Sequence, residues 1–243
     1  VSGMSQASAM QWWQNSLDEM GVQGMERLLP RDATWEHVLQ SGHDDFQIAC
    51  DVTGMTLGRD RTAVEIGCGV GRMTQALGEH FGRVIGLDVA PALLEQARQR
   101  NLNPAITFKV VDGVRLPALA EGTVDTVFSY EVLYILHPTV FLQYAKDIFH
   151  LLKPGGEFVF QLNLDPLRWT TRVSYWIRGW LWMFGIKEWR GWPTGPGFRR
   201  HAYTREMVQA AMTAAGLEMV RTHAIVLSRA WFVAKKPLVV DHS

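Results

Sequence analysis

The stretch VEIGCGVGRMT, residues 64–74, joins a β-branched run to three closely spaced glycines. A P-loop requires Lys-Ser/Thr directly after its last glycine, but Arg72 and Met73 follow Gly71. A dinucleotide-binding G-x-G-x-x-G loop requires a third glycine for close helix–strand packing, and Arg72 stands at that position. The pattern is therefore a different one, E-x-G-x-G-x-G, formed by Glu65, Gly67, Gly69 and Gly71.

From residue 62 onward, short β-branched runs alternate with segments of helical periodicity. The predicted strands are 62–67, 83–88, 106–111, 124–130 and 156–163, and the predicted helices are 70–80, 91–101 and 138–152. Pro91 stands where a first-turn proline is favoured, and Lys153-Pro154-Gly155-Gly156 ends a helix before the next strand. This alternation predicts an α/β fold, with a parallel sheet, right-handed crossovers and helices on both faces.

The N-terminal region, residues 1–60, is predicted to form a helical cap. Apolar residues recur at helical spacing over 7–20 and again over 33–40, where the pattern predicts an end before Ser41-Gly42. A third helix is expected from about Asp44. It would place Ile48, Val52 and Met55 on one face.

The alternation is interrupted after the fifth predicted strand by an aromatic, basic insertion at 165–200. A helix over 204–215 follows, capped by Thr204, and two closing strands near 217–226 and 229–235 are expected to pair as a hairpin. The chain is thus divided into a cap (1–60), an α/β core (61–164), an insertion (165–200) and a C-terminal return to the core (201–243).

Composition narrows the class of protein. With 243 residues and 47% hydrophobic residues, the chain can bury a full core. Lys plus Arg equals Asp plus Glu at 24 each, so no overall charge favours a nucleic-acid partner. Two cysteines, Cys50 and Cys68, cannot build a cysteine-rich zinc site, and we expect no metal. The N-terminus lacks a secretory pattern and no apolar run would span a bilayer, which predicts a soluble, cytoplasmic protein.

Three acidic residues end the first three predicted strands. Ligands of an open parallel sheet bind beyond the carboxyl ends of its strands. Glu65 would repel a pyrophosphate but pair with an amino group, Asp88 can accept bonds from ribose hydroxyls, and Asp112 can accept the exocyclic amine of adenine. An amine, a ribose and an adenine without phosphates describe S-adenosylmethionine.

Five motifs follow one another along the chain: VEIGCGVGRMT, VIGLDVAPALLEQAR, VVDGVRLP, VDTVFSYEVLYIL and LLKPGGEFVF. With them the sequence resembles the class I S-adenosylmethionine-dependent methyltransferases, particularly those that act on small molecules. The resemblance covers residues 60–163 and, more loosely, 200–235. It implies a Rossmann-like, mostly parallel sheet of seven strands whose last strand is antiparallel. It also implies S-adenosylhomocysteine as the product of the cofactor.

The resemblance assigns roles residue by residue. The loop on the methionine side would be formed by Glu65, Gly67, Cys68, Gly69 and Gly71. Asp88 and Val89 would hold the ribose, and Asp112, Gly113 and Val114 would flank the adenine. Tyr130 and Glu131 would lie near the sulfonium and the acceptor.

A hydroxyl acceptor must lose its proton, so a general base would help. The first candidate is His137, in YILHPTV, the second is Glu131, and the third is His43, between the N-terminal helices. A surface or capping role is an equal alternative for each. Members of the resembled family often carry histidine where this chain has Tyr134.

The acceptor is expected to be a small molecule. The favoured acceptor atom is an oxygen of a hydrophobic or aromatic natural-product-type compound. Enzymes of the family that methylate amino groups of nucleic-acid bases carry Asn/Asp-Pro-Pro-aromatic after strand four, whereas this chain has Ser129-Tyr130-Glu131-Val132. Net charge zero also disfavours nucleic acid. Three alternatives stay open: an N-methyltransferase, a peripheral membrane enzyme with a lipid or prenyl acceptor, and a non-catalytic binder of S-adenosylmethionine.

The insertion holds six of the ten tryptophans. As a helix, it places one stripe of apolar residues beside Arg168, Arg172 and Tyr175. The stripe consists of Trp169, Val173, Trp176, Ile177, Trp180, Leu181 and Phe184. Its local charge is +5, from seven basic and two acidic residues. Three interpretations stay open: a core helix, a lid with aromatic walls toward the acceptor and arginines available for an anionic group, and a helix that lies on an anionic membrane.

Overall fold

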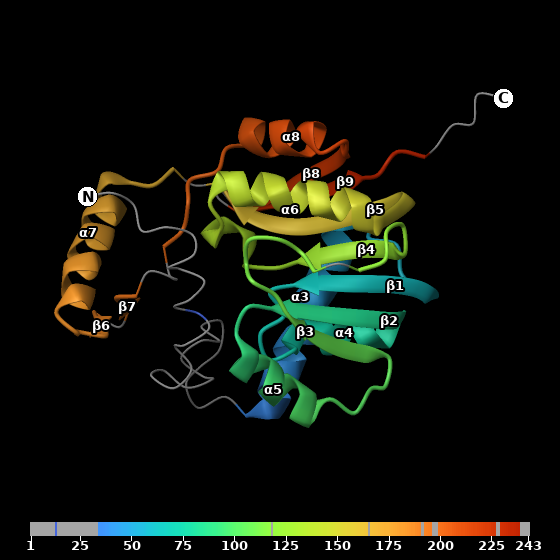
Figure 1. Ribbon diagram of the computed structural model, residues 1–243, viewed down its shortest axis with the longest axis horizontal. Helices are drawn as coiled ribbons and strands as arrows, with labels where there is room; N and C mark the ends of the chain where they lie inside the picture. Colours follow the sequence, from blue (N-terminus) through green and yellow to red (C-terminus); the bar gives the residue numbers. More distant parts are fainter. Residues whose placement is uncertain are drawn as a thin grey trace.

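The described part of the chain is built around a seven-stranded sheet (Figure 1). The computed structural model describes Trp13 and residues 34–117, 119–164, 166–190, 192–195, 199–226 and 229–238, with backbone alone at 224–226. The strands are β1 (Gly58–Ile66), β2 (Phe81–Asp88), β3 (Ile106–Val110), β4 (Val124–Ser129), β5 (Leu152–Asn163), β8 (Glu218–Val226) and β9 (Arg229–Lys235). Their order across the sheet is β3-β2-β1-β4-β5-β9-β8.

Strands β1 to β5 pair in parallel, and β9 runs antiparallel to both β5 and β8. Parallel neighbours need crossover connections, which helices supply. The helices are α3 (Trp35–Thr53), α4 (Arg72–His80), α5 (Pro91–Arg100), α6 (Pro138–Leu151), α7 (Trp169–Met183) and α8 (Arg205–Ala214). The predicted mostly parallel, seven-stranded α/β sheet with one antiparallel strand is therefore confirmed.

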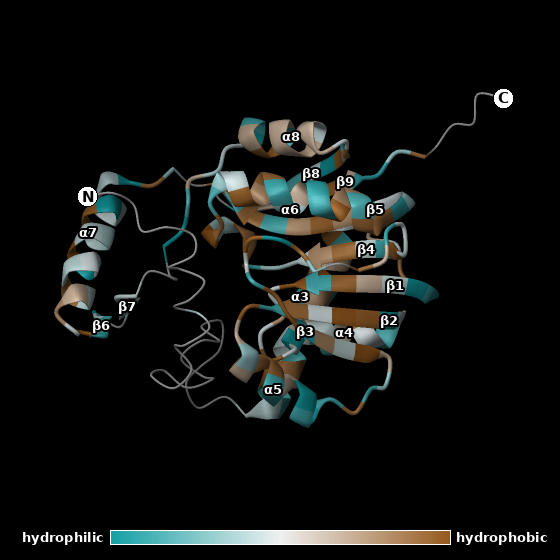
Figure 2. Cartoon of the chain, in the orientation of Figure 1, coloured by the Kyte–Doolittle hydropathy of each residue, from teal (hydrophilic) through white to brown (hydrophobic). Residues whose placement is uncertain are grey.

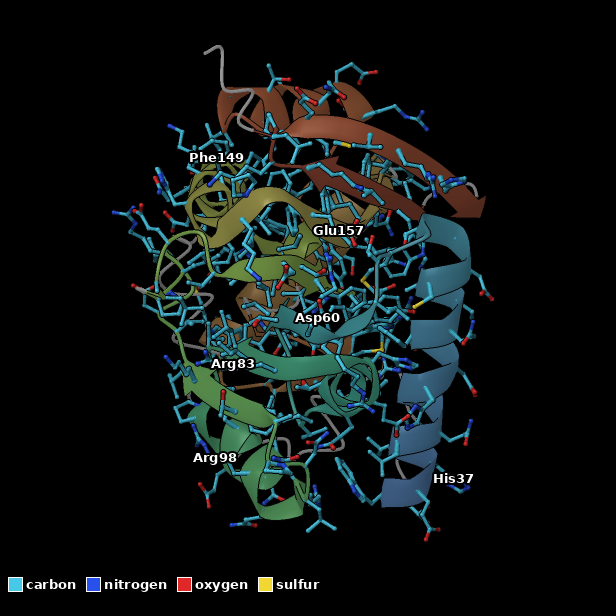
Figure 3. All side chains as sticks on the ribbon, turned by 90° about the vertical axis from the view of Figure 1, so that its right-hand side faces the viewer. His37, Asp60, Arg83, Arg98, Phe149 and Glu157 are labelled. Atoms are coloured by element: carbon cyan, nitrogen blue, oxygen red, sulfur yellow. The ribbon has the colours of Figure 1, made fainter. Side chains whose placement is uncertain are left out.

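The core lies on both faces of the sheet, because successive strand residues point to opposite sides. Val64 and Ile66 of β1 pack into the cluster that α6 and α8 cover. Ala63 belongs to the opposite cluster, with residues of α3, α4 and α5. Figure 3 shows α3 on one side of the sheet and Phe149 of α6 on the other. The hydrophobic segments concentrate in the central strands (Figure 2).

Helix α3 differs from the sequence expectation, because it runs without a break through Ser41-Gly42. Gly42 lies against α4: a Cβ built there would stand 2.3 Å from the carbonyl oxygen of Arg72. The glycine therefore permits close helix packing and does not end the helix. The expected apolar face is also wrong at Ile48, which is 48% exposed, whereas Phe46 is buried. The helix expected over 7–20 lies outside the described residues, apart from Trp13.

The two ends of the sheet carry different groups. Figure 3 looks onto the amino ends of the parallel strands and shows Asp60, Arg83 and Glu157 there. Helix α7 lies beyond the opposite, carboxyl ends (Figure 1), followed by a short hairpin of β6 (Glu188–Trp189) and β7 (Trp192–Pro193). The insertion after strand five thus contains the expected helix, placed at the end where ligands of such sheets bind.

Candidate active site

The chain leaves β1 through a sharp turn made of three glycines. Gly67, Gly69 and Gly71 have φ of 76°, 53° and 87°, in the left-handed region. The amides of Gly67 and Cys68 both donate to the carbonyl oxygen of Leu87, at 2.7 and 3.0 Å. Because glycine adopts positive φ without a Cβ penalty, the loop can fold back over the end of β2 and lead directly into α4.

Gly67 is also the point where this loop meets the segment after β4. A Cβ built on Gly67 would lie 2.3 Å from Cγ2 of Val132. Two independent demands, the positive φ and the contact with Val132, therefore both require glycine here. The turn and the segment after β4 consequently lie against each other at Gly67, where the missing side chain leaves room for Val132.

Two carboxylates, Glu65 and Asp88, stand beside this loop at the ends of β1 and β2. Oε2 of the buried Glu65 accepts a hydrogen bond from the Thr74 hydroxyl at 2.5 Å. Asp88 accepts from the amides of Gly69 and Ala90, both at 2.9 Å. Burial raises the pKa of Asp88, and these amide donors oppose the rise. Since a carboxylate offers about four lone-pair sites, both acids retain capacity for a ligand.

A cavity of about 880 Å³ opens where these strands end. This volume lies in the upper part of the ~300–1,000 Å³ range of ligand pockets. Of the residues predicted to bind the cofactor, the cavity is lined by Glu65, Gly67, Cys68, Gly69, Asp88, Val89, Gly113 and Tyr130. Gly71, Asp112 and Val114 do not line it. The structure therefore brings most of the predicted set together at one cavity.

Asp112 and Val114 are both exposed and stand just beside the cavity wall formed by Gly113. Oδ1 of Asp112 accepts from the amides of Val114 and Arg115, at 2.7 and 2.8 Å. Such a contact between a side chain and the backbone that follows is typical of an Asx turn. Asp112 thus shapes the loop after β3 through one of its oxygens.

Glu131 enters the cavity directly after β4. Its backbone has φ 55°, which is uncommon for a non-glycine residue and costs about 1–3 kcal/mol. Its Oε1 lies 3.2 Å from Nε of Arg229, at the start of β9. Burial raises the pKa of Glu131, while Arg229 and the hydrogen-bond donors Gln161 and Tyr134 oppose this rise. The result is a half-buried carboxylate held in one place by its neighbours.

Tyr130 is fixed between two side chains. Its ring stacks on Trp231 with the centroids 5.5 Å apart, and the guanidinium of Arg72 lies 5.6 Å from the ring centroid. Arg72 is itself buried, pairs with Asp45 at 2.6 Å and donates to the carbonyl oxygen of Ser41 at 2.9 Å. Burial raises the pKa of Tyr130 to about 12. At neutral pH, this phenol is therefore a protonated wall of the cavity and no base.

The two predicted histidines do not line the cavity. His137 is the N-cap of α6, and its Nδ1 accepts from the amide of Thr139 at 3.3 Å. His43 lies on α3, where Nε2 is 3.4 Å from the carboxylate of Glu79 on α4. Of the three candidate bases, the structure brings Glu131 alone into the cavity.

Helix α7 presents a polar face to the cavity. Thr171, Ser174, Tyr175 and Arg178 line it at the i, i+3, i+4, i+7 spacing of one helix face. The predicted aromatic stripe lies on the opposite face, with exposures of 75% for Trp169, 55% for Trp176, 45% for Trp180 and 74% for Phe184. The stripe is therefore not core. The expectation of aromatic lid walls is also wrong for these tryptophans, because the polar face of the helix takes that place.

Four arginines line the same cavity, and the sequence pattern singled out none of them for the site: Arg72, Arg178, Arg200 and Arg229. Arg72 lies within the glycine motif, at the position where a dinucleotide-binding loop has its third glycine. Arg229 begins β9 opposite Asn163 of β5. Because β5 and β9 are far apart in the sequence, only the strand pairing shows that Arg229 reaches the site.

Within the described ranges, no three His, Cys, Asp or Glu side chains converge in a way that could hold a metal ion. A search of the described helices finds none long and apolar enough to cross a membrane. Cys50 and Cys68 form no disulfide with each other. Burial raises the pKa of the Cys50 thiol to about 11, so this cysteine is a poor nucleophile at neutral pH.

Comparisons with known proteins identify the domain that contains the glycine loop. Residues 63–156 match the family model of a methyltransferase domain. Trans-aconitate 2-methyltransferase from Methylobacterium radiotolerans is 35% identical over 106 residues, which cover 42% of this chain and 38% of that protein. A ubiquinone biosynthesis O-methyltransferase from Xanthomonas euvesicatoria is 30% identical over 114 residues, which cover 45% of this chain and 46% of that protein.

The chain thus spans less than half the length of these curated relatives. A chain of the solved complex between the Haloferax volcanii Trm112 methyltransferase activator and a methyltransferase has a TM-score of 0.64, with 19% identity. The match covers 94% of this chain and 99% of that one, and at this identity it shows the fold. The sheet order, the glycine loop and the family match agree: the chain carries a class I S-adenosylmethionine-dependent methyltransferase domain, whose cofactor is S-adenosylmethionine.

Proposed function

We propose that this protein transfers a methyl group from S-adenosylmethionine to an oxygen of a small-molecule acceptor. The observation that carries the proposal is the cavity itself, which joins the glycine loop and its two acids to the half-buried carboxylate of Glu131. When bound, the cofactor supplies a methyl group already activated on a sulfonium. The protein then contributes mainly by holding the two reactants in line, an effect worth several kcal/mol in well-oriented systems.

The residues present fit the cofactor by the chemistry of their side chains. Glu65 suits its amino group, and Asp88, with Val89 beside it, suits the two ribose hydroxyls. Gly113 lines the cavity where the adenine would lie. Asp112 uses only Oδ1 in its turn, which leaves Oδ2 for an exocyclic amine. The remaining predicted residues are proposed as backbone and van der Waals contacts of the cofactor: Gly67, Cys68, Gly69, Gly71, Val114 and Tyr130.

Glu131 is the proposed general base. Burial moves the pKa of Glu131 upward, toward neutral pH. A general base is most effective when its pKa lies near the pH at which the enzyme works. A base of this kind typically contributes about 10²–10⁴ to the rate. His137, the first sequence candidate, is better explained as the cap of α6, and His43 as a contact between α3 and α4.

We further propose which segments cover the site and which residues contact the acceptor. Trp13 and α7 line the same cavity, which supports closure by the N-terminal segment and by the 165–200 insertion. An aromatic or hydrophobic part of the acceptor would contact Ile135, Leu136 and Trp192. The names of the two relatives, one an O-methyltransferase, favour oxygen over nitrogen.

Calorimetric titration with S-adenosylmethionine and S-adenosylhomocysteine tests the cofactor site, and micromolar binding is expected. Methyl transfer from labelled cofactor to panels of phenols, hydroxy acids and amines then tests the reaction. Glu131→Gln should lower turnover by about 10²–10⁴ without changing cofactor affinity, whereas His137→Ala should leave turnover unchanged. Turnover of amines alone, with Glu131→Gln active, would favour N-methylation. Cofactor binding without turnover of any panel would favour a non-catalytic binder.

A second candidate function, attachment to an anionic membrane with a lipid or prenyl acceptor, is supported by the exposed stripe of α7. Trp169, Trp176 and Trp180 are exposed on the side of the helix that faces away from the cavity, with Arg168 and Arg172 nearby. Tryptophan with basic residues is typical of helices that lie in a membrane interface. Co-sedimentation with phosphatidylglycerol vesicles should be lost in Trp176→Ala/Trp180→Ala and kept in Leu102→Ala, an exposed control. Equal binding of both variants would contradict attachment through α7.

A further inference from the structure

Charge is divided across the cavity according to the order of the strands. The acids Glu65, Asp88 and Glu131 come from the ends of β1, β2 and β4. The arginines on the other side come from α7, from the segment before α8, and from β9, which neighbours β5. Glu65 and Asp88 are the acids proposed for the amino group and the ribose hydroxyls of the cofactor, and Glu131 is the acid proposed to face the acceptor. The basic half is therefore left for the acceptor.

Among the described residues, acids pair with Arg72 and with Arg229. Arg72 pairs with Asp45 at 2.6 Å, and Arg229 pairs with Glu131 at 3.2 Å. Arg200 is half-buried, and within the described part of the chain no side chain pairs with its guanidinium. Arg200 therefore adds to this side of the cavity a positive charge that no described side chain neutralises.

Arg200 lies beside the polar side chains of α7 that line the cavity. Its backbone amide donates to the hydroxyl oxygen of Tyr175 at 3.3 Å, which leaves the hydroxyl proton of Tyr175 for another acceptor. The guanidinium of Arg178 lies 5.6 Å from the centroid of the same ring and donates to the carbonyl oxygen of Pro193. We call the set Thr171, Ser174, Tyr175, Arg178 and Arg200 the α7 wall. It presents hydroxyl and guanidinium donors and contains no acid.

The residue before Arg200 adds to this potential. Arg199 packs over Gly179 of α7, where an added Cβ would lie 2.7 Å from its Nη2. Its Nε is buried with no hydrogen-bond partner, and burial lowers the pKa of the guanidinium. Arginine stays charged in proteins, so the α7 wall is backed by a further positive charge, for which the described residues supply no counter-ion.

We propose that the acceptor carries a carboxylate or phosphate group, and that the α7 wall binds this anion through Arg200, Arg178 and the hydroxyl of Tyr175. Arginine forks match both anions with paired hydrogen bonds. The backbone amide of His201 donates to the carbonyl oxygen of Tyr134 at 2.8 Å, which fixes the Arg200 segment beside the segment that carries Glu131. An anion at the wall would thus orient the rest of the acceptor toward Glu131. This inference rests on the proposed function.

Calorimetry on the full chain with saturating S-adenosylhomocysteine tests the proposal, with citrate and inorganic pyrophosphate as probes and glycerol as the uncharged comparison. Arg200→Gln removes the central donor. Arg172→Gln removes the same charge from an exposed position of α7 that does not line the cavity. Arg200→Lys restores the charge without the fork. Cofactor affinity and melting temperature should be equal in all four proteins.

We expect wild-type protein and Arg172→Gln to bind at least one anion and not glycerol. Arg200→Gln should bind it at least tenfold more weakly, because a hydrogen bond to a charged group is lost. The anion affinity of Arg200→Lys should lie between those of the wild-type protein and Arg200→Gln. Preference for citrate would assign a carboxylate to the acceptor, and preference for pyrophosphate a phosphate.

Binding of neither anion, or equal binding by wild-type protein and Arg200→Gln, would overturn the anion site while leaving methyl transfer intact. Failure of S-adenosylhomocysteine to bind would instead overturn the proposed function. The anion titrations are repeated on the free protein, so the two conclusions are reached separately.

Discussion

Nε of Arg229 lies 3.2 Å from Oε1 of Glu131, so the first residue of β9 holds the carboxylate that follows β4. Burial raises the pKa of Glu131, and the charge of Arg229 lowers it. If Glu131 must be ionised to accept a proton, kcat/KM falls as pH drops through this pKa. Removing Arg229 takes away the stabilisation of the ionised form, so the pKa rises further.

Arg229→Gln should therefore move the acidic limb of the kcat/KM profile to higher pH. The profile is measured with any acceptor that the wild-type chain methylates. Arg205→Gln, an exposed arginine of α8, serves as the control and should leave the limb in place. An unmoved limb, or one moved to lower pH, would show that Arg229 does not tune the essential acid.

Asp88→Ala should weaken the affinity for S-adenosylhomocysteine by more than tenfold. A hydrogen bond to a charged group is worth roughly 1.5–3 kcal/mol, and this carboxylate also holds the amides of Gly69 and Ala90. Asp125→Ala is the matched control. It loses contacts of the same kind, to the Thr62 amide and to Lys153, but does not line the cavity. Calorimetry with equal affinities for both variants would contradict the assignment of Asp88.

Gly67→Ala should abolish cofactor binding and lower the melting temperature more than Gly122→Ala does. Both glycines have positive φ, 76° and 63°, a conformation that costs other residues about 1–2 kcal/mol. A Cβ on Gly67 would in addition stand 2.3 Å from Val132, whereas none of the surrounding atoms lies within 4 Å of one on Gly122. Equal losses in thermal scans, with unchanged binding, would show that Val132 moves aside freely.

Gly42→Ala should destabilise the protein, against the trend for exposed helix positions. Alanine normally gains about 1 kcal/mol over glycine in a helix interior. At this position a Cβ would meet the carbonyl oxygen of Arg72 at 2.3 Å, so α3 must separate from α4. Urea unfolding measures the effect, with Gln47→Ala on the exposed side of α3 as the control. A gain in stability for Gly42→Ala would mean that the helix contact is loose.

Local signals in the sequence predicted much of the core. The alternation of strands and helices, the glycine motif, and Glu65 and Asp88 at strand ends depend on neighbours within a few residues. The predicted strands 62–67 and 83–88 and the predicted helices 70–80 and 91–101 are confirmed by β1, β2, α4 and α5. The same kind of signal was wrong at Ser41-Gly42, because a glycine that permits packing cannot be told from one that ends a helix until its neighbour is known.

The sequence by itself determined the order of elements, the sharp turn after β1 and the acids beside it. Only the tertiary structure decided which candidate base reaches the cavity, that Arg229 meets Glu131, and which face of α7 turns inward. A helix with a polar face and an aromatic face has the same local pattern in either orientation. The choice depends on contacts between segments far apart in the chain, and those contacts form only when β5, β9 and the insertion are packed together.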